Sequence, residues 1–128
     1  MAAWTGSTNL GDELLLDALR RRVEPLGCRI EPISVDAART TADHGVDAVD
    51  ERRPGQVLAA IGGADALVFG PGGLLQDDSS ALNPPRQLGR VVAARRAGVP
   101  VVATGLGVGP LTGRLNRATS PWARPRQG

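Results

Sequence analysis

One stretch near the middle of the chain joins a short apolar run to a glycine cluster. The run covers residues 66–69, and Gly70, Gly72 and Gly73 follow it directly. A run of this length bounded by turn residues is typical of a strand buried on both faces, as in a parallel sheet. Ligands of open α/β sheets bind beyond the carboxyl ends of the strands. The turn after residue 69 is therefore the first candidate for a binding site.

The same order of apolar run and glycine turn recurs later in the chain. Residues 99–104 form a β-branched apolar run, and Gly105, Gly107 and Gly109 follow it. Helical patterns separate the strand patterns, over residues 12–26, 56–61 and 87–97. This alternation predicts an α/β fold, with a Rossmann-like, doubly wound parallel sheet and right-handed crossovers.

The other segments give weaker signals. The first helix places Leu15, Leu16, Leu19, Val23 and Leu26 on one face and ends at Pro25 and Gly27. Residues 1–4 are too short for a full strand. Residues 29–35 alternate as a strand, and Pro32 suggests that this strand lies near a sheet edge. Residues 36–54 are polar, and we expect a loop or a short irregular segment there.

Composition excludes several classes of function. With 128 residues and 41% hydrophobic residues, the chain is long enough for one globular domain. Aromatic residues make up 2% and the net charge is +2, which argues against a nucleic-acid surface built on ring stacking or on basic charge. The single cysteine, Cys28, excludes an internal disulfide and is expected to be a small buried residue. No stretch predicts a membrane span or a signal peptide, so we expect a cytoplasmic protein.

Two segments carry candidate polar groups, each with a simpler alternative. Asn9, Gly11 and Asp12 lie where a loop enters the first helix, and backbone N–H groups at such a point attract anions or hydroxyls. The alternative is helix capping, which the spacing alone favours. His44, the single histidine, is a candidate general acid, general base or substrate ligand. The favoured alternative is an ordinary solvated residue.

The glycine clusters match no nucleotide-binding motif. The cluster at residues 70–73 lacks the Gly-Lys-Ser/Thr ending of a Walker loop, and residues 105–109 match only the first half of GxGxxG. Tight turns after strands explain most glycine clusters of this kind. They do not explain the polar pair Gln76 and Asp77, which directly follows the buried-type strand and its turn.

Four motifs stand in a fixed order and together resemble a known family. They are Gly6 with Asn-Leu-Gly-Asp-Glu at 9–13, His-Gly-Val at 44–46, Gly-Pro-Gly-Gly-Leu-Leu-Gln-Asp at 70–77 with Ser80, and Gly-Leu-Gly-Val-Gly-Pro-Leu at 105–111. This set, from Gly6 to about Leu115, resembles the N-terminal half of the polysaccharide pyruvyl transferase family, in particular its bacterial cell-wall type. The resemblance implies two Rossmann-like domains, arranged as in two-domain glycosyltransferases of the B type, with the active site between them.

The resemblance also implies a reaction and a set of site residues. The reaction transfers pyruvate from phosphoenolpyruvate to two sugar hydroxyls as a cyclic ketal and releases phosphate, in cell-surface polysaccharide biosynthesis. It needs no metal or cofactor beyond this donor, and its partner is a glycan or lipid-linked sugar acceptor. Asp12, Asp77 and His44 are the candidates for catalysis. The expected substrate-binding residues are Gly6, Asn9, Gly11, Asp12, Gly72, Gly73, Gln76, Asp77, Gly105, Gly107 and Gly109. Of the arginines, Arg86 and Arg114 are expected close to the glycine edge.

The chain departs from the family in three ways. Its first strand is shortened, Pro71 stands where the family usually has another glycine, and the second domain is missing. We therefore expect residues 1–117 to form an N-terminal, acceptor-side half that is a transferase only when a second domain completes it, and residues 118–128 to form an irregular tail. A truncated copy or a fragmentary gene model would have this appearance.

Two other classes of function stay open. A Rossmann-like module that binds a nucleotide or nucleotide sugar would need an acidic residue at the end of its second strand, for which Asp36 is the candidate. Tight nucleotide binding in a calorimetric titration would favour it. A non-functional fragment, folded poorly on its own, would show little amide protection in hydrogen exchange.

Overall fold

Five parallel strands form the main sheet of this protein. The computed structural model describes residues 1–75 and 82–108. The strand order is β3-β2-β1-β4-β6. The strands are β1 (Ala2–Thr5), β2 (Ile33–Ser34), β3 (Val49–Asp50), β4 (Leu67–Phe69) and β6 (Val101–Ala103). The four pairs of neighbouring strands in this sheet are all parallel, which confirms the predicted α/β, Rossmann-like sheet.

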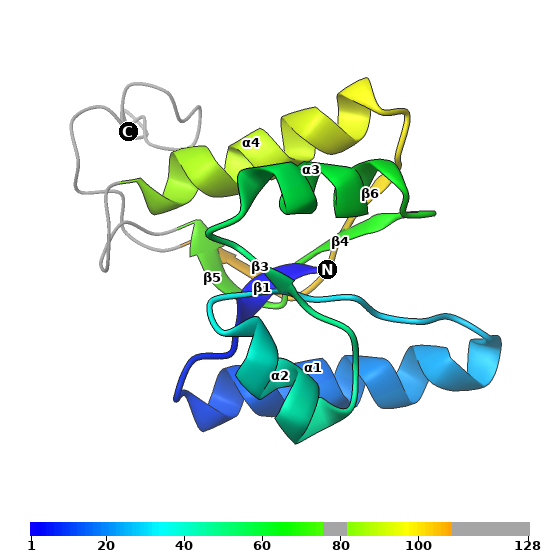
Figure 1. Cartoon of the computed structure of the whole chain (residues 1–128), viewed down its shortest axis with the longest axis vertical. Coiled ribbons are helices and arrows are strands. Elements are labelled where there is room, and N and C mark those ends of the chain that lie inside the picture. Colours follow the sequence, from blue (N-terminus) through cyan, green and yellow to red (C-terminus); the bar gives the residue numbers. More distant parts are fainter. Residues whose placement is uncertain (76–81, 109–128) are drawn as a thin grey trace, which may run out of the picture.

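Helices cover both faces of this sheet. Figure 1 shows α1 (Leu10–Val23) and α2 (Ala37–His44) on one side, and α3 (Pro54–Gly62) and α4 (Asn83–Arg96) on the other. The chain changes sides after β3, because β4 pairs with β1 on the edge away from β2. The strand order therefore reverses between β1 and β4. In doubly wound sheets this switch point is where a crevice opens beyond the strand ends.

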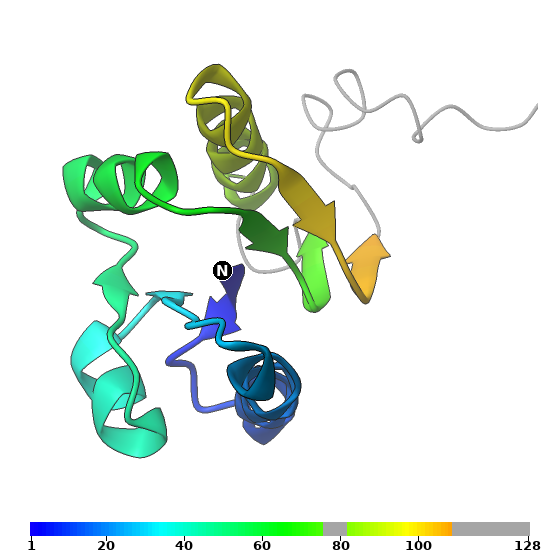
Figure 2. The same cartoon turned by 90° about the vertical axis from the view of Figure 1, so that its right-hand side faces the viewer.

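A second, two-stranded parallel sheet follows the glycine turns. It pairs β5 (Gly72–Leu75) with β7 (Leu106–Val108), and Gly72 is in register with Leu106. Figure 2 shows this pair beside the ends of β4 and β6. Sequence analysis predicted tight turns at both clusters. Each turn instead leads into another short strand, because the chain leaves the main sheet at Gly70 and at Gly105 and continues in extended form.

The hydrophobic core lies mainly between the sheet and the α3/α4 layer. Its buried members are Ala2, Ile33, Val49, Val57, Ile61, Leu67, Phe69, Leu74, Ala94 and Val99. On the other face, α1 buries Leu16 completely, and Leu19 and Val23 partly. The predicted apolar face of α1 was wrong at two positions, since Leu15 and Leu26 are exposed. Leu26 lies beyond the helix, in the single 3₁₀ turn Glu24–Leu26 that ends at Gly27.

Three expectations about the N-terminal half are corrected. Residues 1–4 were expected to be too short for a strand, yet β1 is the central strand of the sheet. Pro32 was expected near an edge, but β2 lies between β1 and β3. Pro32 precedes the strand, and its carbonyl oxygen accepts a hydrogen bond from Val49 N at 2.9 Å. Cys28 was expected to be buried and is exposed, because it follows the turn at Gly27.

The polar segment at residues 36–54 was expected to be a loop or a short irregular segment, but it contains regular structure. Asp36 caps α2, since its carboxylate accepts from Arg39 N at 3.0 Å, and Gly45 ends the helix. The strand β3 and the start of α3 follow in the same segment. In the later part, α4 begins at Asn83, four residues before the predicted start. No helix in the described ranges is long and apolar enough to cross a membrane.

Candidate functional site

Three of the four motifs meet at the carboxyl edge of the sheet. A Cβ atom placed on Gly72 would lie 3.4 Å from Oδ1 of Asp12, in the first turn of α1. Gly72 N also donates to the carbonyl oxygen of Gly105 at 3.1 Å. A Cβ atom on Gly70 would collide with the carbonyl oxygen of Thr104. The start of α1 and both glycine turns therefore form one continuous surface beside the switch point between β1 and β4.

Asn9 acts as the N-cap of α1. Its Oδ1 accepts a hydrogen bond from Gly11 N at 3.0 Å, and its own amide donates to Ser7 Oγ at 3.2 Å. The capping interpretation is therefore correct for Asn9, because its side chain satisfies one of the free amides of the first turn. The Gly11 amide is thereby engaged, which makes this helix start a poorer anion site than its sequence suggests.

Asp12 is the partly buried carboxylate at the centre of this surface. Burial raises the pKa of Asp12, and the neighbouring charge of Glu13 raises it further, while a hydrogen bond from Asn9 acts in the opposite direction. A carboxylate whose proton affinity is increased in this way is better suited to take a proton from a hydroxyl group. Of the predicted catalytic candidates in the described part of the chain, Asp12 is the one that faces the glycine turns.

His44 lies between two carboxylates rather than in solvent. Its Nε2 is 2.6 Å from Glu13 Oε2, its Nδ1 is 3.2 Å from Asp17 Oδ1, and its side chain is 8% exposed. The favoured expectation of a solvated histidine was wrong, because the last residue of α2 packs directly against α1. Burial alone would lower the pKa of His44, but the hydrogen bonds and charges of Glu13 and Asp17 outweigh it and raise the pKa.

Glu13 is a functional candidate that sequence reasoning missed. Its Oε1 accepts from the backbone amide of Gly6 at 2.8 Å, while its Oε2 binds His44. In a capping box the glutamate stands at the third helix position and accepts from the amide of the N-cap residue. Glu13 is at the fourth position and accepts from Gly6, three residues before the N-cap Asn9, so the sequence spacing did not indicate this contact. It did not indicate the histidine partner either, which is 31 residues away.

Buried hydroxyl groups fix the strand ends under this loop. Ser34 Oγ lies 2.8 Å from Thr40 Oγ1, accepts from Asp36 N at 3.0 Å and donates to the carbonyl oxygen of Thr5. Gly6 packs against this network so closely that a Cβ atom would collide with Ser34 Oγ. Asp36, the candidate ribose ligand of the nucleotide alternative, has its carboxylate engaged in capping α2.

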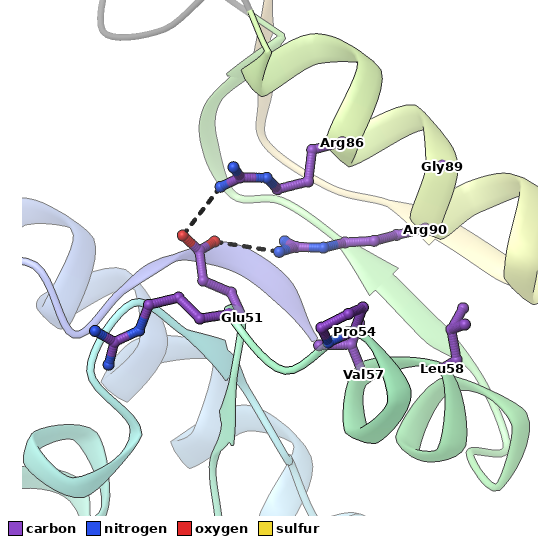
Figure 3. Close-up of a pocket in the computed structure, with 8 residues that line it drawn as sticks. Glu51, Pro54, Val57, Leu58, Arg86, Gly89 and Arg90 are labelled. Carbon is purple, nitrogen blue, oxygen red and sulfur yellow. Dashed lines mark hydrogen bonds and ion pairs between the residues drawn. The ribbon is translucent and has the colours of Figure 1, made fainter.

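A second charged cluster lies at the carboxyl end of β3, beneath α4. Figure 3 shows Arg86 and Arg90 reaching from α4 to the carboxylate of Glu51, each at 3.2 Å. They line an open cavity of about 490 Å³ whose apolar side is formed by Pro54, Val57 and Leu58. Arg90 is buried, and this burial lowers its pKa although Glu51 opposes the effect. Arg86, which was expected close to the glycine edge, binds Glu51 through its guanidinium group.

The remaining predicted site residues fall into two groups. Gly73 is part of β5, and Gly107 is part of β7, so both lie in the small second sheet. Gln76, Asp77, Gly109 and Arg114 lie outside the described residues. The substrate-binding roles of all these residues stay predictions. Among residues 1–75 and 82–108, no group of three or more histidine, cysteine, aspartate or glutamate side chains is arranged to hold a metal ion.

Comparison with known proteins identifies one family. The family model described as polysaccharide pyruvyl transferase matches residues 9–119, which is most of the chain. No curated protein matches, and no solved structure does. The matched region includes the start of α1, His44 and both glycine turns. The chain belongs to the polysaccharide pyruvyl transferase family.

Proposed function

We propose that this chain forms the acceptor side of a pyruvyl transferase that moves pyruvate from phosphoenolpyruvate onto two hydroxyls of a cell-surface glycan or its lipid-linked precursor. The observation that carries the proposal is Asp12, whose carboxylate has a raised pKa and faces Gly72 at the switch point of the sheet. The cytoplasm is the proposed location of this reaction.

The chemistry of ketal formation gives Asp12 a role. One hydroxyl oxygen bonds to C2 of phosphoenolpyruvate, the CH₂ carbon gains a proton, and the C2–O bond to phosphate breaks as the second hydroxyl oxygen adds. The two hydroxyl protons are accounted for by the new methyl group and by the released phosphate. A base must remove each hydroxyl proton as the oxygen attacks. We assign this task to Asp12 for at least one of the two hydroxyls.

The charge at this edge favours a sugar over the phosphate-bearing donor. Asp12 and Glu13 occupy the first turn of α1, and Asn9 already binds the Gly11 amide. The Asp12 carboxylate repels a phosphate but accepts hydrogen bonds from neutral hydroxyls. Arg86 and Arg90, both on α4, are engaged with Glu51. We therefore propose that the cationic groups for the two acidic moieties of phosphoenolpyruvate come from a second domain.

Acceptor binding to the purified full chain tests the proposal. Amide chemical shifts would be followed by NMR during titration with methyl hexosides and N-acetylhexosamines that carry free hydroxyl pairs. We expect shifts at Gly6, Gly11 and Gly72, and a Kd about tenfold weaker for Asp12→Asn, which loses charge-assisted hydrogen bonds. The control Asp65→Asn removes an exposed carboxylate before β4, at the opposite edge of the sheet, and should bind as the wild type does.

Two outcomes would contradict the proposal. Equal sugar binding by Asp12→Asn and the wild type would remove Asp12 from the site. Steady release of phosphate from phosphoenolpyruvate and acceptor by this chain alone would show that no second domain is needed.

A further inference from the structure

A line of contacts connects α2 to the loop in front of α1. It runs from Asp17 to His44 Nδ1 at 3.2 Å, from His44 Nε2 to Glu13 at 2.6 Å, and from Glu13 to the Gly6 amide at 2.8 Å. One oxygen of the Glu13 carboxylate accepts from the Gly6 amide, and the other contacts His44. The position of this carboxylate therefore depends on both partners.

The end of this line is the point where β1 leaves the sheet. The Gly6 amide begins the loop that carries Asn9 to its capping position and brings Asp12 to face Gly72. Glu13 is 17% exposed and His44 is 8% exposed, so water competes weakly for either contact. Without His44, the Glu13 side chain would be free to turn toward solvent, and the Gly6 amide would lose its acceptor.

We infer that His44 is a positioning residue of the acceptor site, which acts through Glu13 to hold the loop of residues 6–9 in the shape that presents Asp12. The inference rests on the proposed function for the identity of the ligand, a neutral sugar hydroxyl. It does not place His44 in contact with the sugar. Both ring nitrogens are engaged by carboxylates, so the inference gives His44 a different role from the general acid, general base or substrate ligand considered from the sequence.

The contacts of His44 with the two carboxylates make its hold on the loop sensitive to pH. Only the imidazolium form carries N–H groups on both nitrogens, so only this form donates to Glu13 and Asp17 together. The charged groups around it are these two carboxylates of α1, the arginines Arg20 and Arg21 that bind Asp17, and Asp43 of α2, which pairs with Arg39. The net effect of the two carboxylates is a raised pKa for His44.

The raised pKa of His44 sets the direction in which pH changes the stability of the loop. A histidine whose folded pKa is raised contributes its full stabilisation below its unfolded value of about 6.5, and the contribution is lost as pH rises through the folded pKa. The loop should therefore be held firmly in mildly acidic solution and loosen at higher pH. Sugar binding should weaken over the same range.

Hydrogen exchange of the Gly6 amide tests the line of contacts without any ligand. In the unmutated chain, the protection of this amide should fall about tenfold as His44 loses its proton, after correction for the intrinsic pH dependence of exchange. The matched control is the Arg39 amide, which is also held by a carboxylate, that of Asp36 at 3.0 Å, and should show no such step. The ring nitrogens of His44, followed by NMR, give the midpoint independently.

Two variants separate positioning from simple packing. His44→Gln should lower Gly6 protection about tenfold at acidic pH and abolish the pH step. Asp17→Asn leaves the His44–Glu13 pair intact but removes one carboxylate, so the midpoint of the step should move to lower pH. A Gly6 amide whose protection is unchanged by pH and by His44→Gln would overturn the inference, as would an Asp17→Asn midpoint equal to that of the wild type.

The sugar titration distinguishes this inference from the proposed function. If the positioning role holds, His44→Gln should bind sugar about three- to tenfold more weakly and without the wild-type pH dependence. If no sugar binds to the wild type, the proposed function fails, and the exchange data still decide whether His44 holds the loop. If sugar binds equally well to His44→Gln while Asp12→Asn loses it, the positioning role fails and the proposed function stands.

Discussion

Gly6 shows how one residue fixes the end of a strand. Its φ of +75° lies in the left-handed region that favours glycine. A Cβ atom there would collide with Ser34 Oγ and lie 2.8 Å from Asp36 N. Both neighbours are held, since Ser34 binds Thr40 and the Asp36 amide in turn binds Ser34 Oγ. The cost of any side chain at Gly6 therefore has two parts, backbone strain and steric overlap.

Gly6→Ala should reduce the free energy of unfolding by about 2–4 kcal/mol, because strain at positive φ and overpacking add. Gly27→Ala is the matched control, with a φ of +77° and nothing within 4 Å of the added Cβ atom. It should cost about 1 kcal/mol from strain alone. Urea unfolding followed by circular dichroism measures both. Equal losses in the two variants would mean that the contacts around Gly6 relax freely.

Some single residues were predictable from the sequence and others were not. The capping role of Asn9 and the place of Asp12 follow from local spacing, because each acts within its own helix turn. The partners of His44 lie 27 and 31 residues away, and nothing in a polar segment indicates which helix it will pack against. Contacts between elements are set by tertiary packing, which local patterns do not encode.

Among the elements, those with a clear apolar pattern were predicted, and those in polar or glycine-rich segments were not. The helix α1 has an apolar repeat and clear stop residues, and α4 ends at the expected glycine region. The strand β2 lies within the predicted strand at residues 29–35, whereas β3 has two residues, too few to show alternation, and α2 is polar along most of its eight residues. β5 and β7 each contain glycine, which is depleted in strands and normally indicates a turn.

The Glu51 cluster joins the end of β3 to α4, and its removal tests that link. Glu51→Gln should destabilise the protein by about 2–4 kcal/mol, because Arg90, which is 5% exposed, would lose its charged partner. Arg86→Gln is the control, since Arg86 binds the same carboxylate but is half exposed, and it should cost less than about 1 kcal/mol. Thermal or urea unfolding gives both values. A larger loss for Arg86→Gln than for Glu51→Gln would contradict this assignment.

For the whole molecule, stability should depend far more on the centre of the sheet than on β6. Phe69 is 4% exposed and belongs to the main core, whereas Val102 of β6 is 51% exposed. Phe69→Ala should reduce the free energy of unfolding by about 3–5 kcal/mol through lost burial and a cavity. Val102→Ala should change it by less than about 0.5 kcal/mol. Comparable losses in urea unfolding would show that β6 is buried in solution.

The class of the whole fold could be predicted, but its detailed order could not. Alternating strand and helix patterns predict a parallel sheet with helices on both faces, and this was confirmed. The same alternation does not predict that β4 pairs with the edge of β1 opposite β2, the arrangement that creates the switch point. The strand order was therefore not predicted, and it is known from the structure alone.

The two glycine turns, at Gly70 and Gly105, contact each other, which limits the insertions that either turn can accept. Gly70 is packed against the carbonyl oxygen of Thr104, and the Cβ position of Gly105 lies 3.0 Å from Pro71. Neither turn can gain a residue without displacing the other. Insertions in one turn should therefore be tolerated only with a compensating change in its neighbour, so the two loops are constrained to evolve as a pair.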